Sequence, residues 1–242
     1  MANLKEIRNR ISSVSSTMQI TSAMKMVSAA KLKKAQDAIT AMRPYSDKLT
    51  ELLQSLSASL DGDSGSKYAD NREVKKVLIV AITSNRGLAG AFNSNILKQV
   101  TLLANETYTG KQVDYIALGK KANDFLSKKS TVVSNHSPVF DDLTFENVSI
   151  IAEELMELFV EGKYDKIDIV YNKFKNAATQ LVITEQFLPI VPAEEGETAA
   201  ADYKFEPSKA EIVEQLIPKS LKTQLYKAVR DSFASEHGAR MT

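Results

Sequence analysis

The first 60 residues carry apolar side chains at alternating steps of three and four, which is the spacing of a coiled-coil seam. No glycine occurs between Met1 and Leu60, and the only helix breaker is Pro44, so the pattern predicts one long helix that Pro44 kinks or divides. At 1.5 Å per residue this helix reaches about 85 Å and must project beyond its own globular body. The seam comprises Leu4, Ile7, Ile11, Val14 and Met18, then the polar Thr21, Lys25 and Ser28, then Leu32, Ala35, Ile39, Met42, Ser46, Leu49, Leu53, Leu56 and Leu60.

The middle of the chain alternates short β-branched runs with helical patterns, after turn chemistry at residues 61–66. This alternation predicts a mostly parallel, Rossmann-like α/β sheet that helices cover on both faces. The predicted strands are 77–83, 113–118, 131–133, 167–171 and 181–187, and the predicted helices are 95–104, 121–127 and 145–160. Residues 189–207 have the composition of a surface loop.

Residues 208–242 return to a helical pattern. Ser208 is a suitable N-cap, with Glu211 as its capping-box partner. An apolar stripe is interrupted at Pro218 and resumes at Leu221, and it still runs when the chain stops at Thr242, as in an interrupted helix. The sequence therefore divides into an N-terminal coiled-coil helix (1–60), an α/β domain (61–207) and a C-terminal helix (208–242).

Composition limits the possible classes of protein. A chain with 43% hydrophobic and 25% charged residues is typical of a folded soluble protein, and its net charge of +1 gives no argument for nucleic acid. With no cysteine there is no disulfide framework, thiolate metal site or cysteine nucleophile. The longest apolar run, 77–82, is far shorter than the ~20 residues that span a bilayer. The first ten residues lack the apolar core of a signal peptide. We expect a cytosolic protein that reaches a membrane only through a partner.

The turn after the first predicted strand, residues 84–90 (SNRGLAG), occupies the position of a phosphate-binding loop. It lacks G-x-G-x-x-G and Gly-Lys-Ser/Thr, and no acidic residue ends the second strand. We interpret it as a tight turn in which Gly87 and Gly90 permit close packing. His136 and His237 have no companions at metal-ligand spacing. The sequence thus indicates no catalytic residue, no metal and no cofactor.

The N-terminal helix has no acidic residue between Glu6 and Asp37, although six cations lie there. A solvated helix usually mixes charge signs to gain pairs four residues apart. A one-signed stretch is also compatible with an ordinary basic face, but the seam turns polar in the same place. A permanently buried seam would not place three polar residues in succession. This combination favours a surface that meets an acidic partner.

Three segments resemble, in the same order, the gamma subunit of F-type ATP synthases. They are residues 7–36 (IRNRISSVSSTMQITSAMKMVSAAKLKKAQ) with the later Arg43-Pro44-Tyr45, residues 80–93 (VAITSNRGLAGAFN) and residues 234–241 (ASEHGARM). The first and last segments are highly specific, and the resemblance extends from Leu4 to Thr242.

The resemblance implies that the terminal helices form an antiparallel coiled coil inside a ring of alternating alpha and beta subunits. The α/β domain then forms a foot that binds the epsilon subunit and the membrane c-ring. Proton flow turns ring and shaft, and the shaft drives the catalytic beta subunits through their conformational cycle for ATP synthesis. The chain itself is then no enzyme and binds neither nucleotide nor nucleic acid. Its expected location is the cytoplasmic face of the bacterial inner membrane, as part of the complex.

The resemblance also implies contacts. The basic run from Lys25 to Lys34 faces acidic lever loops of the beta subunits. Members of the family continue for several turns past the last segment, so we expect an incomplete shaft tip. The implied partner-binding residues are Arg8, Met24, Lys25, Lys31, Lys33, Lys34, Glu236 and Arg240. Two other hypotheses are a Rossmann-like nucleotide-binding enzyme with a coiled-coil oligomerisation arm, and a coiled-coil adaptor unrelated to energy conversion.

Overall fold

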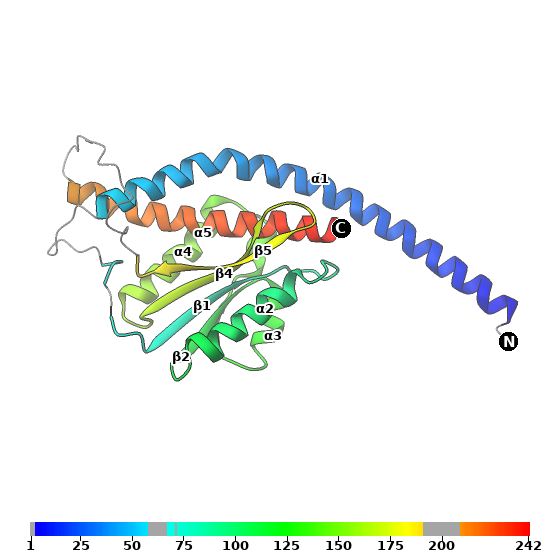
Figure 1. Ribbon diagram of the computed structural model, residues 1–242, viewed down its shortest axis with the longest axis horizontal. Coiled ribbons are helices and arrows are strands. Elements are labelled where there is room, and N and C mark those ends of the chain that lie inside the picture. Colours follow the sequence, from blue (N-terminus) through cyan, green and yellow to red (C-terminus); the bar gives the residue numbers. More distant parts are fainter. Residues whose placement is uncertain (1–2, 58–66, 71, 191–208) are drawn as a thin grey trace.

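The computed structural model describes residues 3–57, 67–70, 72–190 and 209–242. Helix α1 (Leu4–Ser57) is a single helix of 54 residues, which corresponds to about 80 Å. Pro44 lies inside it on an exposed side, and the helix curves along its length without dividing (Figure 1). On the solvent side, water replaces the hydrogen bond that proline removes, so a bend is tolerated. The predicted linker at 61–66 and nearly all of the predicted loop at 189–207 lie outside the described residues.

A five-stranded sheet has the order β3-β2-β1-β4-β5. Neighbouring strands among the first four are parallel, and the last strand returns antiparallel to β4, so the predicted mostly parallel sheet is confirmed. The strands are β1 (Lys76–Ile82), β2 (Gln112–Leu118), β3 (Val132–Asn135), β4 (Lys166–Phe174) and β5 (Gln180–Leu188).

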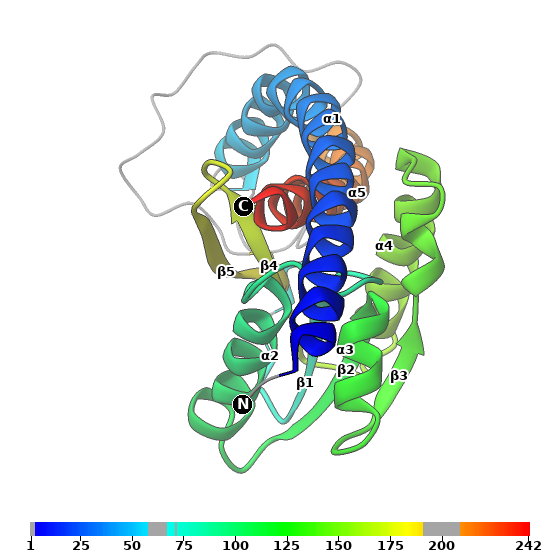
Figure 2. The same cartoon turned by 90° about the vertical axis from the view of Figure 1, so that its right-hand side faces the viewer.

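Helices cover both faces of the sheet, as predicted (Figures 1 and 2). One face carries α2 (Phe92–Leu102), a following π-helical turn (Leu103–Thr107) and α3 (Lys120–Leu126). The other carries α4 (Phe145–Val160) and α5 (Lys209–Met241), after a 3-10 turn at Ser137–Phe140. Side chains of β1 alternate between the two cores: Ile79 packs towards α2, and Leu78 packs towards α4 and α5.

Helix α1 packs along the outer side of α5 and forms a further layer (Figure 2). Pro218 does not interrupt α5, which runs as one helix through it. The predicted seam is buried at Leu32, Ala35, Ile39 and Leu49. Ser28, which we expected on a polar, exposed stretch of the seam, is also buried, because its small side chain fits the helix contact.

The first twenty or so residues of α1 project away from the rest of the part that the structure describes. This stretch extends past the end of α5, and every residue from 3 to 23 is exposed (Figure 1). Its apolar seam is therefore open to solvent, with Leu4 at 74% and Val14 at 68% exposure. Among the described residues, no helix is long and apolar enough to cross a membrane. The predicted cap at Ser208 lies outside the described ranges.

Candidate functional site

The three segments singled out in the sequence meet in space at the carboxyl end of the sheet. The β1–α2 turn, the middle of α1 and the last turns of α5 enclose a groove with a volume of about 510 Å³. A second hollow of about 250 Å³ shares four of its residues. The groove is lined by Ile20, Ala23, Met24, Val27, Ser28, Lys31, Arg86, Gly87, Leu88, His237 and Arg240.

Side-chain hydrogen bonds hold the β1–α2 turn in one shape. The backbone N–H of Ser84 donates to Oδ1 of Asn93 at 2.9 Å, and the Ser84 hydroxyl donates to the carbonyl of Arg86 at 2.6 Å. Nδ2 of Asn85 donates to the carbonyl of Ser137 at 2.9 Å. These bonds pre-organise the turn, so the side chains that follow Ser84 are presented to the groove from a rigid base.

The backbone of this turn corrects the expectation about its glycines. A Cβ added to Gly87 or Gly90 would meet no atom within 4 Å, so neither residue serves close packing. Gly90 is instead required by its φ of +54°. The close approach occurs at the end of β2, where a Cβ on Gly119 would lie 2.3 Å from the carbonyl oxygen of Thr83. Leu88 adopts a φ of 58° although it is not glycine, and it is 78% exposed.

The charges of the site are mostly positive. Arg240 donates to Oε1 of Glu236, one turn before it on α5, and both side chains are only 10% exposed. Burial raises the pKa of the Glu236 carboxyl, while Arg240, Lys31 and Arg86 act against that shift. Three cations thus surround one buried carboxylate, and the site keeps an excess of positive charge that attracts an acidic group.

His237 lies beneath these cations and carries no charge at neutral pH. Burial, with the nearby positive charges of Arg240 and Lys31, lowers its pKa to about 4. The ring of Phe233 packs edge-on against it, with centroids 4.5 Å apart. Its Nε2 has no hydrogen-bond partner among the described residues. His237 therefore contributes shape and polarity to the site but no cationic charge.

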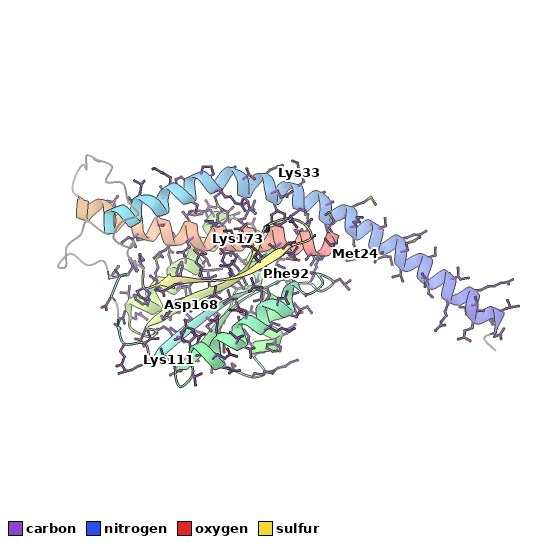
Figure 3. The ribbon with its side chains drawn as sticks, viewed as in Figure 1. Met24, Lys33, Phe92, Lys111, Asp168 and Lys173 are labelled. Atoms are coloured by element: carbon purple, nitrogen blue, oxygen red, sulfur yellow. The ribbon has the colours of Figure 1, made fainter. Side chains whose placement is uncertain are left out.

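The structure brings together only some of the residues that we expected to bind a partner. Met24, Lys31, Glu236 and Arg240 line the groove or the hollow beside it. The other four are exposed along α1 and line neither, and they are Arg8, Lys25, Lys33 and Lys34. Figure 3 shows Lys33 on the outer side of α1 and Met24 near the end of α5.

Lys33 is also partly neutralised, because its Nζ lies 3.2 Å from Oδ1 of Asp37. Sequence reasoning missed Arg86, Leu88 and His237. The first two lie in the turn that the sequence analysis interprets as a tight strand-to-helix turn, and the available signal is an arginine and a leucine in a glycine-rich turn. His237 had been considered only as a metal ligand.

The site has the features of a contact surface. Within the described ranges, no three histidine, aspartate or glutamate side chains gather as they would around a metal ion. The ring of His136 is paired with Glu154, because Oε2 of Glu154 lies 2.8 Å from Nε2 of His136. Apolar side chains of α1, with Lys31 on the same helix, face Arg86 and Arg240 across an open groove, which suits an amphipathic acidic segment of another protein.

A long helix that packs along α5 over an α/β domain and then projects well beyond both defines a shaft-and-foot protein. A family model described as ATP synthase matches residues 3–242. The ATP synthase gamma chain of Flavobacterium psychrophilum is 70% identical over 100% of this chain and 85% of its own length, and that of Geobacter sp. is 41% identical over the same shares. The chain belongs to the ATP synthase gamma-chain family.

Solved structures share the fold at lower identity. The central stalk and c-ring structure of the Tetrahymena thermophila mitochondrial ATP synthase contains a chain that is 23% identical, with a TM-score of 0.66 over 92% of this chain and 96% of that one. The rotor of the Euglena gracilis mitochondrial ATP synthase contains another at 23% identity, with a TM-score of 0.65 over 97% and 86%. At these identities the likeness establishes the fold.

Proposed function

We infer that the chain is the central-stalk rotor subunit of an F-type ATP synthase, and that it couples rotation of the c-ring to conformational cycling of the catalytic beta subunits. The observation that carries this function is the projecting half of α1. An apolar seam of five residues, 43–74% exposed, is unusual on an isolated helix in water and demands protein neighbours. In a rotor these neighbours are the rest of the shaft and the ring of alpha and beta subunits around it.

The three parts of the chain take separate roles in this proposal. Residues 1–60 and 208–242 form the shaft as an antiparallel coiled coil, and residues 61–207 form the foot. The foot binds the epsilon subunit and the membrane c-ring, and the complex sits on the cytoplasmic face of the bacterial inner membrane. A foot with a sheet covered on both faces suits this role, because it is rigid enough to transmit torque.

The acidic lever loops of the beta subunits meet the groove and the basic stretch of α1. The excess of positive charge at Lys31, Arg86 and Arg240 supports this contact, as does the absence of acidic residues between Glu6 and Asp37. Contacts made mainly by charge let the shaft pass three similar partners in turn. The proposed partner-binding residues are Arg8, Met24, Lys25, Lys31, Lys33, Lys34, Glu236 and Arg240.

The chain acts by differential contact and is not itself catalytic. Each orientation of an asymmetric shaft stabilises a different state of each beta subunit, and so biases nucleotide binding and release elsewhere. The alternative, a Rossmann-like nucleotide-binding enzyme, is not favoured, because the β1–α2 turn lacks the fingerprint residues and family membership covers the whole chain.

Charge reversal tests the proposed contact. Lys31→Glu, Lys33→Glu and Lys34→Glu together should lower ATP-driven proton pumping by the assembled complex at least tenfold, since six units of charge change opposite acidic loops. Pumping is measured in sealed vesicles together with ATP hydrolysis.

The matched control is Lys128→Glu with Lys129→Glu, two exposed lysines after α3, on the far side of the sheet from the shaft. This control should pump at close to the wild-type rate. Equal losses in both variants would refute the role of the basic stretch, and normal coupled synthesis by a complex assembled without the chain would refute the proposed function.

A further inference from the structure

Asp231 of α5 is a fully buried carboxylate at the place where three elements pack together. Its exposure is 0%, and its Oδ1 lies 3.7 Å from Nη2 of Arg43 on α1. Neither carboxylate oxygen has a hydrogen bond of normal geometry among the described residues. A buried charge with so few partners is costly for stability, so its presence calls for another explanation.

Positive groups from all three elements face this carboxylate. Burial raises the pKa of Asp231, and the opposing groups are Arg43 of α1, Lys227 of α5, and Lys173 and the amide of Phe174 on β4. Lys173 lies on β4 beside α5 (Figure 3). One carboxylate therefore interacts with positive groups on both helices of the shaft and on a strand of the foot.

Buried apolar side chains of mixed size lie at this contact. Leu32, Ala35 and Ile39 of α1 form one cluster with Phe174 of β4 and Ala234 of α5. Ser235 of α5 is also buried, and its hydroxyl donates to the carbonyl of Asn172 on β4. The interface is also tight, since a Cβ on Gly238 would lie 3.2 Å from Cα of Ala177 at the β4–β5 turn. This apolar packing favours one register, and a buried charge pair adds to that preference, because the pair is lost when the helices slip. In coiled coils, a single buried polar residue at such a position selects one register.

We propose that Asp231 is a positioning residue that fixes the register of α1 against α5, and of both against β4. A slip of one helical turn shifts α1 by about 5.4 Å. It would carry Arg43 away and leave the buried Asp231 without its ion-pair partner on α1, which is destabilising. If the chain is a rotor subunit, as proposed above, the register matters because shaft and foot must turn as one body.

A distance measurement on the full chain tests the register. The chain has no native cysteine, so Thr40→Cys on α1 and Lys219→Cys on α5, both exposed, accept spin labels without background. Pulsed electron spin resonance should give one narrow distance in the parent chain. Asp231→Asn should broaden it or add a second distance, since a neutral amide tolerates a wrong register better than a charge does.

Two further variants control this measurement. Asp168, near the start of β4, is another buried carboxylate, and it accepts a hydrogen bond from Tyr108. Asp168→Asn should leave the distance distribution narrow. Arg43→Lys keeps the counter-charge and should also stay narrow. An unchanged distribution in Asp231→Asn, or equal broadening in Asp168→Asn, would overturn the proposal.

The assembled complex separates this inference from the proposed function. Asp231→Asn should lower the number of protons pumped per ATP hydrolysed at least twofold, at a temperature where all variants remain assembled, and Asp168→Asn should not. Broadened distances with normal pumping would overturn the link between register and coupling. Failure of the wild-type chain to restore pumping would instead refute the proposed function and leave the distance result intact.

Discussion

Leu88 combines a left-handed backbone with an exposed side chain, and both properties are unfavourable for leucine. A non-glycine residue in this region costs about 1–2 kcal/mol. Leucine at 78% exposure gains almost nothing by burial in return. Strain of this kind is tolerated at functional sites, so we infer that Leu88, which lines the groove, contacts a partner.

Replacing Leu88 by glycine should therefore separate stability from function. We expect Leu88→Gly to stabilise the isolated chain by about 0.5–1 kcal/mol, because relief of the strained φ outweighs the added flexibility of the unfolded chain. Leu88→Ala keeps the strain and should leave stability within about 0.5 kcal/mol of wild type. Both variants should pump fewer protons in the complex. Chemical denaturation measures the first effect, and a less stable Leu88→Gly would contradict the strain argument.

His237 should make the free energy of unfolding depend on pH in the acid range. Its pKa is lowered to about 4 in the folded state, so the unfolded chain takes up a proton first as the pH falls. The contribution of the neutral His237 ring to stability is fully present above pH 6.5 and is lost as the pH falls from 6.5 to 4. At 1.36 kcal/mol per pH unit this loss amounts to about 3 kcal/mol. His237→Gln should flatten that part of the profile in denaturation experiments. An identical slope in both proteins would show that other groups carry it.

At the scale of elements, α1 is one helix with two environments. Its second half buries a seam against α5, whereas residues 3–23 are exposed throughout. Helix propensity alone gives little stability in water, so the projecting half depends on neighbours that the complex supplies.

Two truncations on the same seam test this division. Leu32→Ala, at 4% exposure, should destabilise the isolated chain by about 2–4 kcal/mol, since it leaves a cavity against α5. Ile11→Ala, at 63% exposure, should change stability by less than about 0.5 kcal/mol. Thermal or urea denaturation gives both values. A large loss for Ile11→Ala would mean that the projecting half already packs against something in the isolated chain.

The elements themselves were largely predictable. Strands with β-branched apolar runs, such as 77–82, carry a strong local signal because both of their faces are buried. The effect of the two prolines was left more open by the sequence. Pro44 and Pro218 each lie inside a continuous helix, since tertiary packing along the rest of the helix outweighs one lost hydrogen bond.

The molecule as a whole joins its foot to its shaft along a closely packed, mainly apolar interface that contains the buried Asp231. Residues of α5 that line the groove and its neighbouring hollow follow Asp231 within the next few turns of the helix. The surface proposed to meet the beta subunits is therefore close to the place where α1, α5 and β4 pack together. Forces on Arg240 reach the foot through α5 and its contacts with β4. By this route the proposed charge contact at the groove would act on the whole rotor.

The sequence by itself determined the long helix, the parallel sheet, the one-signed charge of α1 and the family, because each depends on local periodicity, composition or the order of motifs. Only the tertiary structure decided that Arg86, Lys31 and Arg240 share one groove and that Arg43 faces Asp231, since these residues are far apart in the chain and no local pattern couples them. It also decided that one seam is filled along half its length and open along the rest, because that depends on where α5 lies.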